Sequence, residues 1–242
     1  MPALRALFFD IDDTLFSTTW FARRARRNAV RAMIEAGLDH EESTVLAELA
    51  EVISEFSSNY GQHYDKLLTR LPRRQIAGGN DALIVAAGVA AYHDTKFREL
   101  EPFSDVIPLL EDLRATDLRL GIITHGRTVK QAEKMVRLGL VRHFDPGACF
   151  ISEQIGISKP NPKLYRVALS RLGLQPNEAA YVGDNPRHDI APVQSLGMVG
   201  IYASRSSKYP LGEVRPDHTI DHFGDLRTLL REVYGVPLPA HG

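Results

Sequence analysis

The chain has 242 residues, a net charge of −1 and one cysteine, Cys149. A length of this order fits one large domain or two modest ones, and the nearly neutral charge gives no global field that would favour nucleic acid or a membrane surface as a partner. A lone cysteine excludes an internal disulfide and a zinc site built from cysteines, and it is typical of a reducing compartment.

Nothing in the apolar patterning predicts targeting to a membrane. An acidic cluster stands near the N-terminus, where a signal peptide would need an apolar core. The longest apolar stretch, around residues 82–91, is much shorter than the ~20 residues that cross a bilayer. We therefore expect a cytoplasmic protein with no membrane partner.

The first predicted strand is the apolar run 7–9, which ends at Asp10. In extended chain Asp10 and Asp12 point to the same side, past the end of the strand, and Asp13 turns away. Burying an unpaired carboxylate costs free energy, so these groups should bind something. Two close carboxylates can acquire different pKa values, suited to attack and to proton transfer, or they can hold a divalent cation.

Residues 17–100 contain no convincing strand, and their apolar residues recur at helical spacing. A first helix should lie between the possible N-caps Ser17–Thr19 and Gly37. Further helices are predicted over 41–57, 60–71 and 81–98. This all-helical block interrupts a chain that is otherwise α/β.

From residue 101 onwards, predicted strands and helices alternate. The strands are 118–123, 148–151, 179–182, 198–202 and 218–220, and the helices are 104–114, 129–138, 160–172, 190–195 and 226–233. Such alternation predicts a parallel sheet covered on both faces. We expect an α/β core made of residues 1–16 plus 101–242, with residues 17–100 as an inserted helical domain.

Polar residues follow several of these strands, where open α/β sheets bind their ligands. Thr124-His125-Gly126 follows the second strand, and its hydroxyl and backbone N–H groups could bind a phosphate. The alternative is that Thr124 only caps the helix that begins near Thr128. We favour the phosphate-binding interpretation because the other strand ends are also polar.

Two further motifs carry charge. Lys159 stands at the N-terminal approach to a helix, where the dipole disfavours a cation, so an anion in front of it would explain its position. Lys163 is a competitor for this role, but it falls within the helix. Asp184 follows an apolar strand as Asp10 does, and the two carboxylates could share one cation.

The chain therefore carries four polar motifs in this order: Asp10-Ile-Asp12-Asp-Thr14, Thr124, Lys159-Pro-Asn-Pro162, and Gly183-Asp184 with Asp189. Together they resemble the four motifs of the haloacid dehalogenase-like (HAD) hydrolases, most of which are phosphatases. The resemblance extends from about Leu4 to Leu230. It implies a Rossmann-like core with an inserted C1-type helical cap domain. His125 is a departure, because the family usually has Asn or Asp at that position.

The resemblance also implies roles for the site residues. Asp10 would be the nucleophile and Asp12 the general acid and base. The presence of Asp12 favours phosphoryl chemistry over dehalogenation, because the dehalogenases of this family do not carry the second acid. The expected Mg²⁺ would be held by Asp10, Asp184 and the backbone carbonyl of Asp12, with Asp189 orienting these ligands.

The expected phosphate-binding residues are Thr124, His125, Gly126 and Lys159. The predicted function is hydrolysis of a small-molecule phosphate ester through an aspartyl phosphate. A sugar phosphomutase and a non-catalytic binding protein on the same fold are the alternatives.

The helical block carries a basic stripe on its first helix and an acidic stripe on its second. The basic residues are Arg23, Arg24, Arg27 and Arg31, and the acidic residues are Glu48, Glu51 and Glu55. The basic stripe could bind an anionic substrate or nucleic acid. We favour a solvated face, because the acidic stripe has matching spacing and could pair with it at the surface, where each pair is worth ~0–1 kcal/mol. We expect no nucleic-acid partner. The sequence does not distinguish a monomer from a homodimer.

Overall fold

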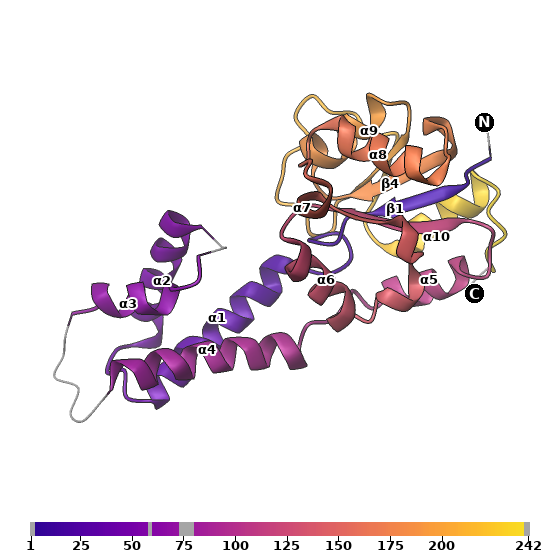
Figure 1. The fold of residues 1–242 in the computed structure, drawn as a ribbon. Coiled ribbons are helices and arrows are strands. Elements are labelled where there is room, and N and C mark those ends of the chain that lie inside the picture. Colours follow the sequence, from indigo (N-terminus) through magenta and orange to yellow (C-terminus); the bar gives the residue numbers. More distant parts are fainter. Residues whose placement is uncertain (1–2, 58–59, 73–79, 240–242) are drawn as a thin grey trace. The chain divides into compact units, whose positions relative to one another are not determined.

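The structure is a computed structural model that describes residues 3–57, 60–72 and 80–239. The chain folds into two compact units, which are residues 1–18 with 101–242 and residues 19–100. We call them the α/β unit and the helical unit (Figure 1). Along the parts of the chain that the structure describes, no helix combines the length and apolarity needed to cross a membrane.

The α/β unit is built on a parallel sheet of six strands in the order β3-β2-β1-β4-β5-β6. The strands are β1 (Ala6–Phe9), β2 (Arg119–Thr124), β3 (Cys149–Ile151), β4 (Ala179–Gly183), β5 (Val199–Ala203) and β6 (His218–Ile220). The first strand along the chain is therefore central in the sheet, with β2 on one side and β4 on the other. The predicted Rossmann-like parallel α/β sheet is confirmed.

Successive side chains of β1 serve opposite faces of the sheet, as the strand period of two requires. Phe8 belongs to a buried cluster with Phe150, Tyr165 and Tyr181. Phe9 stacks on Phe223 on the other face. Because both faces are covered, the central strands are apolar along their whole length, which is typical of parallel sheets.

Helices cover the sheet on both sides (Figure 1). They are α5 (Val106–Leu113), α6 (Thr128–Arg137), α7 (Ser152–Ile155), α8 (Pro162–Leu172), α9 (Ala191–Gln194) and α10 (Phe223–Glu232). Short turns of 3-10 helix span Val141–His143, Pro146–Ala148 and Pro176–Glu178, and a π-helical turn spans Pro186–Ile190. The sequence did not predict α7 or the π-helical turn, because both are short and neither carries an apolar repeat.

The helical unit contains α1 (Thr18–Glu35), α2 (Glu42–Phe56), α3 (His63–Arg70) and α4 (Asp81–Arg98). Its core is formed by aliphatic side chains from all four helices, including Met33, Leu49, Leu67 and Ile84. These positions follow the helical spacing in the sequence, and burial of one apolar face is what stabilises such helices.

The arginines of the basic stripe are exposed, as expected for a solvated face, but the described ion pairs do not join them to the acidic stripe. Arg27 and Arg31 pair with Glu42 at the start of α2, and Arg24 pairs with Glu99. The acidic stripe pairs with another helix, because α3 packs against α2 and brings Arg70 to Glu48 and Glu55.

Candidate active site

The register of the sheet brings three of the predicted site residues to one edge. Phe9 lies between Ile122 of β2 and Val182 of β4, and the backbone N–H of Asp10 donates to the carbonyl of Val182 at 2.9 Å. Asp10 and Asp184 therefore follow β1 and β4, and Thr124 is the last residue of β2, so all three lie at the carboxyl ends of neighbouring strands.

Three carboxylates form a buried acidic cluster at this edge. One oxygen each of Asp10, Asp184 and Asp189 lies within 4.8 Å of the others, and the three residues are only 7%, 5% and 1% exposed. Within the described ranges, Oδ2 of Asp184 is buried without a hydrogen-bond partner. Carboxylate oxygens are the ligands of hard divalent cations, so this donor set fits a metal ion.

The π-helical turn after β4 places Asp189 in the cluster. The backbone N–H of Asn185 donates to Oδ2 of Asp189 at 2.9 Å, and the hydroxyl of Tyr165 donates to the carbonyl of His188 at 2.7 Å. A Cβ on Gly183 would lie 2.5 Å from Cγ of Asp189, so only glycine lets the carboxylate approach this closely. Asp189 thus lies among the candidate metal ligands.

Lys159 is the cation of the site. Its Nζ lies 2.8 Å from Oδ1 of Asp10 and 2.8 Å from Oδ1 of Asp189, and the residue is 6% exposed. The ammonium also donates to the hydroxyl of Tyr181 at 2.5 Å, and that hydroxyl donates to the carbonyl of Ile123 at 2.7 Å. Lys163, the competitor for this role, is exposed on α8.

The electrostatics of the cluster favour a bound cation. Burial, offset in part by Lys159, raises the pKa of Asp10 to about 6. Burial, together with the charges of Asp189 and Asp10, raises the pKa of Asp184 to about 8. Burial alone would lower the pKa of Lys159, but Asp10 and Asp189 raise it above its ordinary value. The lysine therefore stays charged, and the raised pKa values of Asp10 and Asp184 mean that a metal ion on these two carboxylates would compete with protons.

The side chain of Asp12 is held apart from the acidic cluster. Both of its oxygens accept from Nζ of Lys134, at 2.5 and 2.6 Å, and they also accept from Gln131 at 3.1 Å and from Thr18 at 3.2 Å. Burial would raise the pKa of Asp12, but Lys134 and the two other donors hold it below its ordinary value. The neighbouring Asp13 turns away with a φ of 55°.

Lys134 and Gln131 were missed by the sequence analysis. Both lie on α6, three residues apart, and they look like ordinary polar residues on an exposed helix face. Only the position of α6 after β2 could have indicated them, because that helix begins at the same sheet edge as Asp12.

The hydroxyl of Thr124 is available for a ligand. It is fully buried, and its Oγ1 has no hydrogen-bond partner among the residues that the structure describes. It does not cap α6, since the residue at the N-cap position is Arg127. The backbone N–H of Thr128, in the first turn of α6, donates instead to Glu153 at 2.6 Å.

His125 and Gly126 form hydrogen bonds with serine side chains of the same unit. Nδ1 of His125 lies 3.0 Å from the hydroxyl of Ser158 and 3.3 Å from that of Ser152, and burial together with Lys159 lowers its pKa. The backbone N–H of Gly126 donates to Oγ of Ser152 at 2.9 Å. In this conformation the N–H of Gly126 is not offered to a phosphate.

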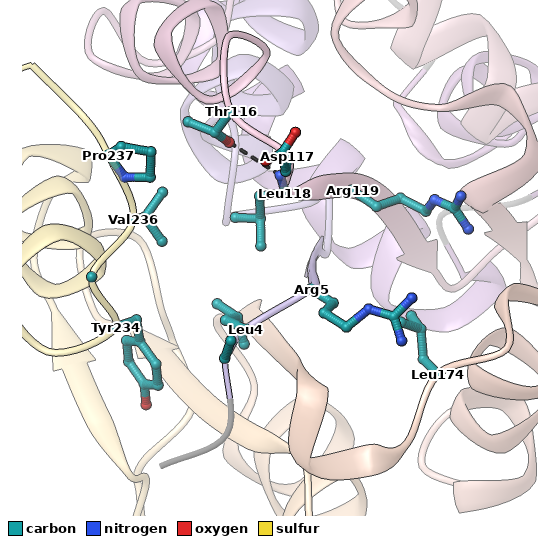
Figure 2. Close-up of a pocket in the computed structure, with 12 residues that line it drawn as sticks. Leu4, Arg5, Thr116, Asp117, Leu118, Arg119, Leu174, Tyr234, Val236 and Pro237 are labelled. Atoms are coloured by element: carbon teal, nitrogen blue, oxygen red, sulfur yellow. Dashed lines mark hydrogen bonds between the residues drawn. The ribbon is translucent and has the colours of Figure 1, made fainter.

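A separate pocket of about 410 Å³ lies at the opposite ends of the strands. Figure 2 shows Leu4, Leu118 and Val236 around it, next to the residues that precede β1 and β2. Its two arginines have partners, because Arg5 pairs with Glu178 and Arg119 with Asp145. This pocket is not part of the candidate active site.

Comparisons with known proteins agree with this geometry. The model of the haloacid dehalogenase-like hydrolase family matches residues 4–197. The chain is 45% identical over 237 residues to the glyceraldehyde 3-phosphate phosphatase of Methanopyrus kandleri, which covers 95% of this chain and 98% of the relative. It is 34% identical over 231 residues to the enzyme of the same name from Methanocaldococcus jannaschii, with the same coverage of 95% and 98%.

A solved structure shares the fold. The HAD phosphatase of Thermococcus onnurineus superposes with a TM-score of 0.66 at 23% identity, covering 94% of this chain and 98% of the other. The relatives confirm the prediction of a phosphoric monoester hydrolase. Since the family model matches most of the chain and relatives at 34% identity and above match nearly all of it, the protein belongs to the haloacid dehalogenase-like hydrolase family.

Proposed function

We propose that the protein is a Mg²⁺-dependent phosphatase that hydrolyses a small phosphate ester, with glyceraldehyde 3-phosphate as the first candidate substrate. The observation that carries the proposal is the buried group of Asp10, Asp184, Asp189 and Lys159, together with the hydroxyl of Thr124, which has no hydrogen-bond partner in the described part of the chain. These groups provide carboxylates for a metal ion, an ammonium for an anion, and a hydrogen-bond donor for a phosphate oxygen.

The side chains of Asp10 and Asp184 would hold Mg²⁺ together with the backbone carbonyl of Asp12, and Asp189 would supply a further oxygen or orient the others. The ligands are all oxygen atoms, which suits Mg²⁺ better than softer metals. When bound, the ion would neutralise negative charge on the phosphate and on the carboxylates.

Asp10 acts as the nucleophile in this proposal. Its carboxylate oxygen attacks the phosphorus atom, and the bond from phosphorus to the substrate oxygen breaks, so that an aspartyl phosphate forms. Lys159 and Thr124 bind the phosphoryl oxygens and stabilise the charge that develops there. His125, whose side chain faces Ser152 and Ser158, contributes to the shape of the phosphate-binding turn.

Asp12 transfers protons in both halves of the reaction. To act, its carboxyl group must leave the contact with Lys134 and carry a proton, which it gives to the oxygen that leaves as the alcohol. The resulting carboxylate then accepts a proton from the water that attacks the aspartyl phosphate, so Asp12 ends the cycle protonated again. The second step releases inorganic phosphate and restores the carboxylate of Asp10. The sum is one water consumed for each ester hydrolysed.

Residues 17–100 would act as the cap domain that selects the substrate and excludes water during the reaction. Their insertion between the segment of Asp10 and the segment of Thr124 supports this role. The names of the two relatives supply the candidate substrate, glyceraldehyde 3-phosphate. A phosphomutase would use the same groups, but no specific contact favours transfer to a sugar over transfer to water.

The test is release of phosphate from glyceraldehyde 3-phosphate and from an aryl phosphate, with Mg²⁺ and with a chelator. We expect turnover that needs Mg²⁺ and that is lost in Asp10→Asn. Asp117→Asn is the matched control, because Asp117 is exposed and lies at the opposite ends of the strands. Turnover that survives in Asp10→Asn would overturn the assignment of Asp10 as the nucleophile. Absence of turnover in the native protein would overturn the phosphatase proposal.

A further inference from the structure

The imidazole ring of His125 is held at one nitrogen and open at the other. Nδ1 lies 3.0 Å from the hydroxyl of Ser158 and 3.3 Å from that of Ser152. Nε2 has no hydrogen-bond partner among the residues that the structure describes, and the residue is exposed. Because the two ring nitrogens point in different directions, a ring that is fixed at Nδ1 directs Nε2 away from the serines.

The contacts at Nδ1 favour a proton on Nε2. Oγ of Ser152 accepts from the backbone N–H of Gly126 at 2.9 Å, which leaves the hydroxyl proton of Ser152 to be donated. Burial and the charge of Lys159 lower the pKa of His125, although Asp12 acts in the opposite direction, so the ring is neutral at about pH 7. A neutral ring that accepts at Nδ1 carries its one proton on Nε2 and can donate it to a ligand.

His125 lies at the rim of a site whose floor is buried. The floor consists of Asp10, Thr124 and Lys159, which are only 7%, 0% and 6% exposed. His125 directly follows Thr124, yet it is exposed. Groups that bind the phosphoryl oxygens in the proposed reaction therefore lie deeper than the imidazole ring.

The stereochemistry of phosphoryl transfer directs the rest of the substrate toward this rim. The attacking and the leaving oxygens lie roughly in line through the phosphorus atom. Because Asp10 attacks from the buried floor, the leaving oxygen and the carbon chain behind it point to the exposed side. The effect of Asp12 on the pKa of His125 supports this placement, since Asp12 is the residue that meets the leaving oxygen in the proposed reaction.

We propose that His125 is a specificity-determining residue, whose Nε2–H donates to an oxygen on the carbon chain of the substrate. The substrate class is a phosphate ester with a hydroxyl or carbonyl group one or two carbons from the phosphorylated carbon. Glyceraldehyde 3-phosphate has both groups. This inference rests on the proposed function, because it deepens substrate recognition at the same site.

The experiment compares glyceraldehyde 3-phosphate with propyl phosphate, which has the same carbon chain and neither of these oxygens. The measured quantity is the ratio of the two kcat/KM values, which does not depend on the fraction of active protein. We expect the native protein to prefer glyceraldehyde 3-phosphate. His125→Ala should lower the ratio by about 3–10-fold, which is the contribution of one hydrogen bond between uncharged groups.

Two further variants test which ring nitrogen matters. The amide nitrogen of glutamine reaches about as far along the side chain as Nε2 of histidine, whereas that of asparagine reaches about as far as Nδ1. His125→Gln should therefore keep most of the preference for glyceraldehyde 3-phosphate, and His125→Asn should lose it. If the ring served only to bond the serines, asparagine would be the better replacement.

His222→Ala is the matched control. His222 is exposed and precedes α10, beside the edge strand β6 and away from the central strand β1. The same replacement there should leave the ratio of the two kcat/KM values unchanged.

The outcomes separate this inference from the proposed function. Equal losses for both esters in His125→Ala would assign the ring to the phosphate or to the fold, and would overturn the inference. A preference that survives in His125→Asn but not in His125→Gln would also overturn it, as would a native protein that hydrolyses both esters equally well. A native protein that hydrolyses neither ester would overturn the proposed function, and this inference with it.

Discussion

Nζ of Lys159 lies 2.8 Å from Oδ1 of Asp10, and both groups are buried at the end of the central strand. The same ammonium contacts Asp189 at 2.8 Å, so one cation offsets two carboxylates while Asp184 has no lysine at all among its described hydrogen bonds. When the three carboxylates are ionised the site holds more negative than positive charge, and a divalent cation that binds there would stabilise the folded protein.

Lys159→Met should abolish activity and destabilise the protein. Removing one partner of a buried ion pair leaves an uncompensated charge, which costs about 3–5 kcal/mol. We expect the free energy of unfolding to fall by about that amount at pH 8 and by less at pH 5, where protonation of Asp10 relieves the unpaired charge. Urea unfolding at both pH values measures the effect.

Loss of the phosphoryl contact should also lower kcat/KM of Lys159→Met by about 10²–10³-fold. Lys163→Met controls for replacement of a lysine that is exposed on α8. A stability of Lys159→Met equal to that of the native protein at pH 8 would contradict the buried ion pairs.

Metal binding should depend on pH. The pKa values of Asp10 and Asp184 are raised to about 6 and about 8 in the metal-free fold, above the ~3.9 of an unfolded chain. A raised carboxyl pKa contributes stability at low pH and loses it as the pH rises through the folded-state value. The metal-free protein should therefore lose stability between about pH 4 and pH 8.

Mg²⁺ should reverse this loss, because it binds the ionised carboxylates and displaces their protons. We expect Mg²⁺ to raise Tm more at pH 8 than at pH 5.5, and thermal unfolding with and without the ion measures this. Asp184→Asn removes one of the buried charges, so at pH 8 it should stabilise the metal-free protein by roughly 1–3 kcal/mol and lose the response to Mg²⁺. An undiminished response to Mg²⁺ in Asp184→Asn would place the metal elsewhere.

Thr124→Val should reduce activity without reducing stability. Valine keeps the shape of the side chain and removes a buried hydroxyl that has no partner among the described residues, so the free energy of unfolding should stay the same or rise by about 0.5–1 kcal/mol. A hydrogen bond to a charged group is worth about 1.5–3 kcal/mol, so kcat/KM should fall by roughly 10–100-fold.

Steady-state kinetics and urea unfolding of Thr124→Val check these two expectations, and Thr124→Ser is the matched control that keeps the hydroxyl. If Thr124→Val were unstable but fully active, the hydroxyl would serve the fold rather than a ligand.

The sequence predicts the strand-end residues of the site well, because their position follows from the sheet alone. Parallel strands end at one edge, so Asp10, Thr124 and Asp184 must converge once the strands are recognised. The buried position of Lys159 follows from its place before α8, where a cation without an anionic partner would be unfavourable. The confirmed parallel sheet rests on the same apolar runs.

The sequence does not predict the groups that support these residues. In the sequence, Tyr181 looks like one more apolar residue of β4. Its hydrogen bonds with Lys159 and with the carbonyl of Ile123 depend on the packing of three segments. Lys134 and Gln131 have the composition of an exposed helix face. Periodicity tells which face of a helix is apolar, but it does not tell which polar residue meets a distant carboxylate.

Gly126→Ala should impair catalysis through Gln131. Gly126 has a φ of 138°, which alanine tolerates poorly, and a Cβ there would lie 2.7 Å from Nε2 of Gln131. Gly139→Ala is the matched control, because Gly139 also has a positive φ, 68°, but a Cβ there would meet nothing within 4 Å. Gly139→Ala should lose about 1 kcal/mol of stability from backbone strain, and Gly126→Ala should lose more, because its φ lies further from the left-handed region and its Cβ would meet the amide. Only Gly126→Ala should displace the amide that joins Asp12 to the turn of Thr124, so its kcat/KM for glyceraldehyde 3-phosphate should fall by about 10-fold or more while that of Gly139→Ala stays near the native value. Steady-state kinetics and urea unfolding of both variants measure the contrast, and equal activities in the two would show that the space beside Gly126 has no part in placing Gln131.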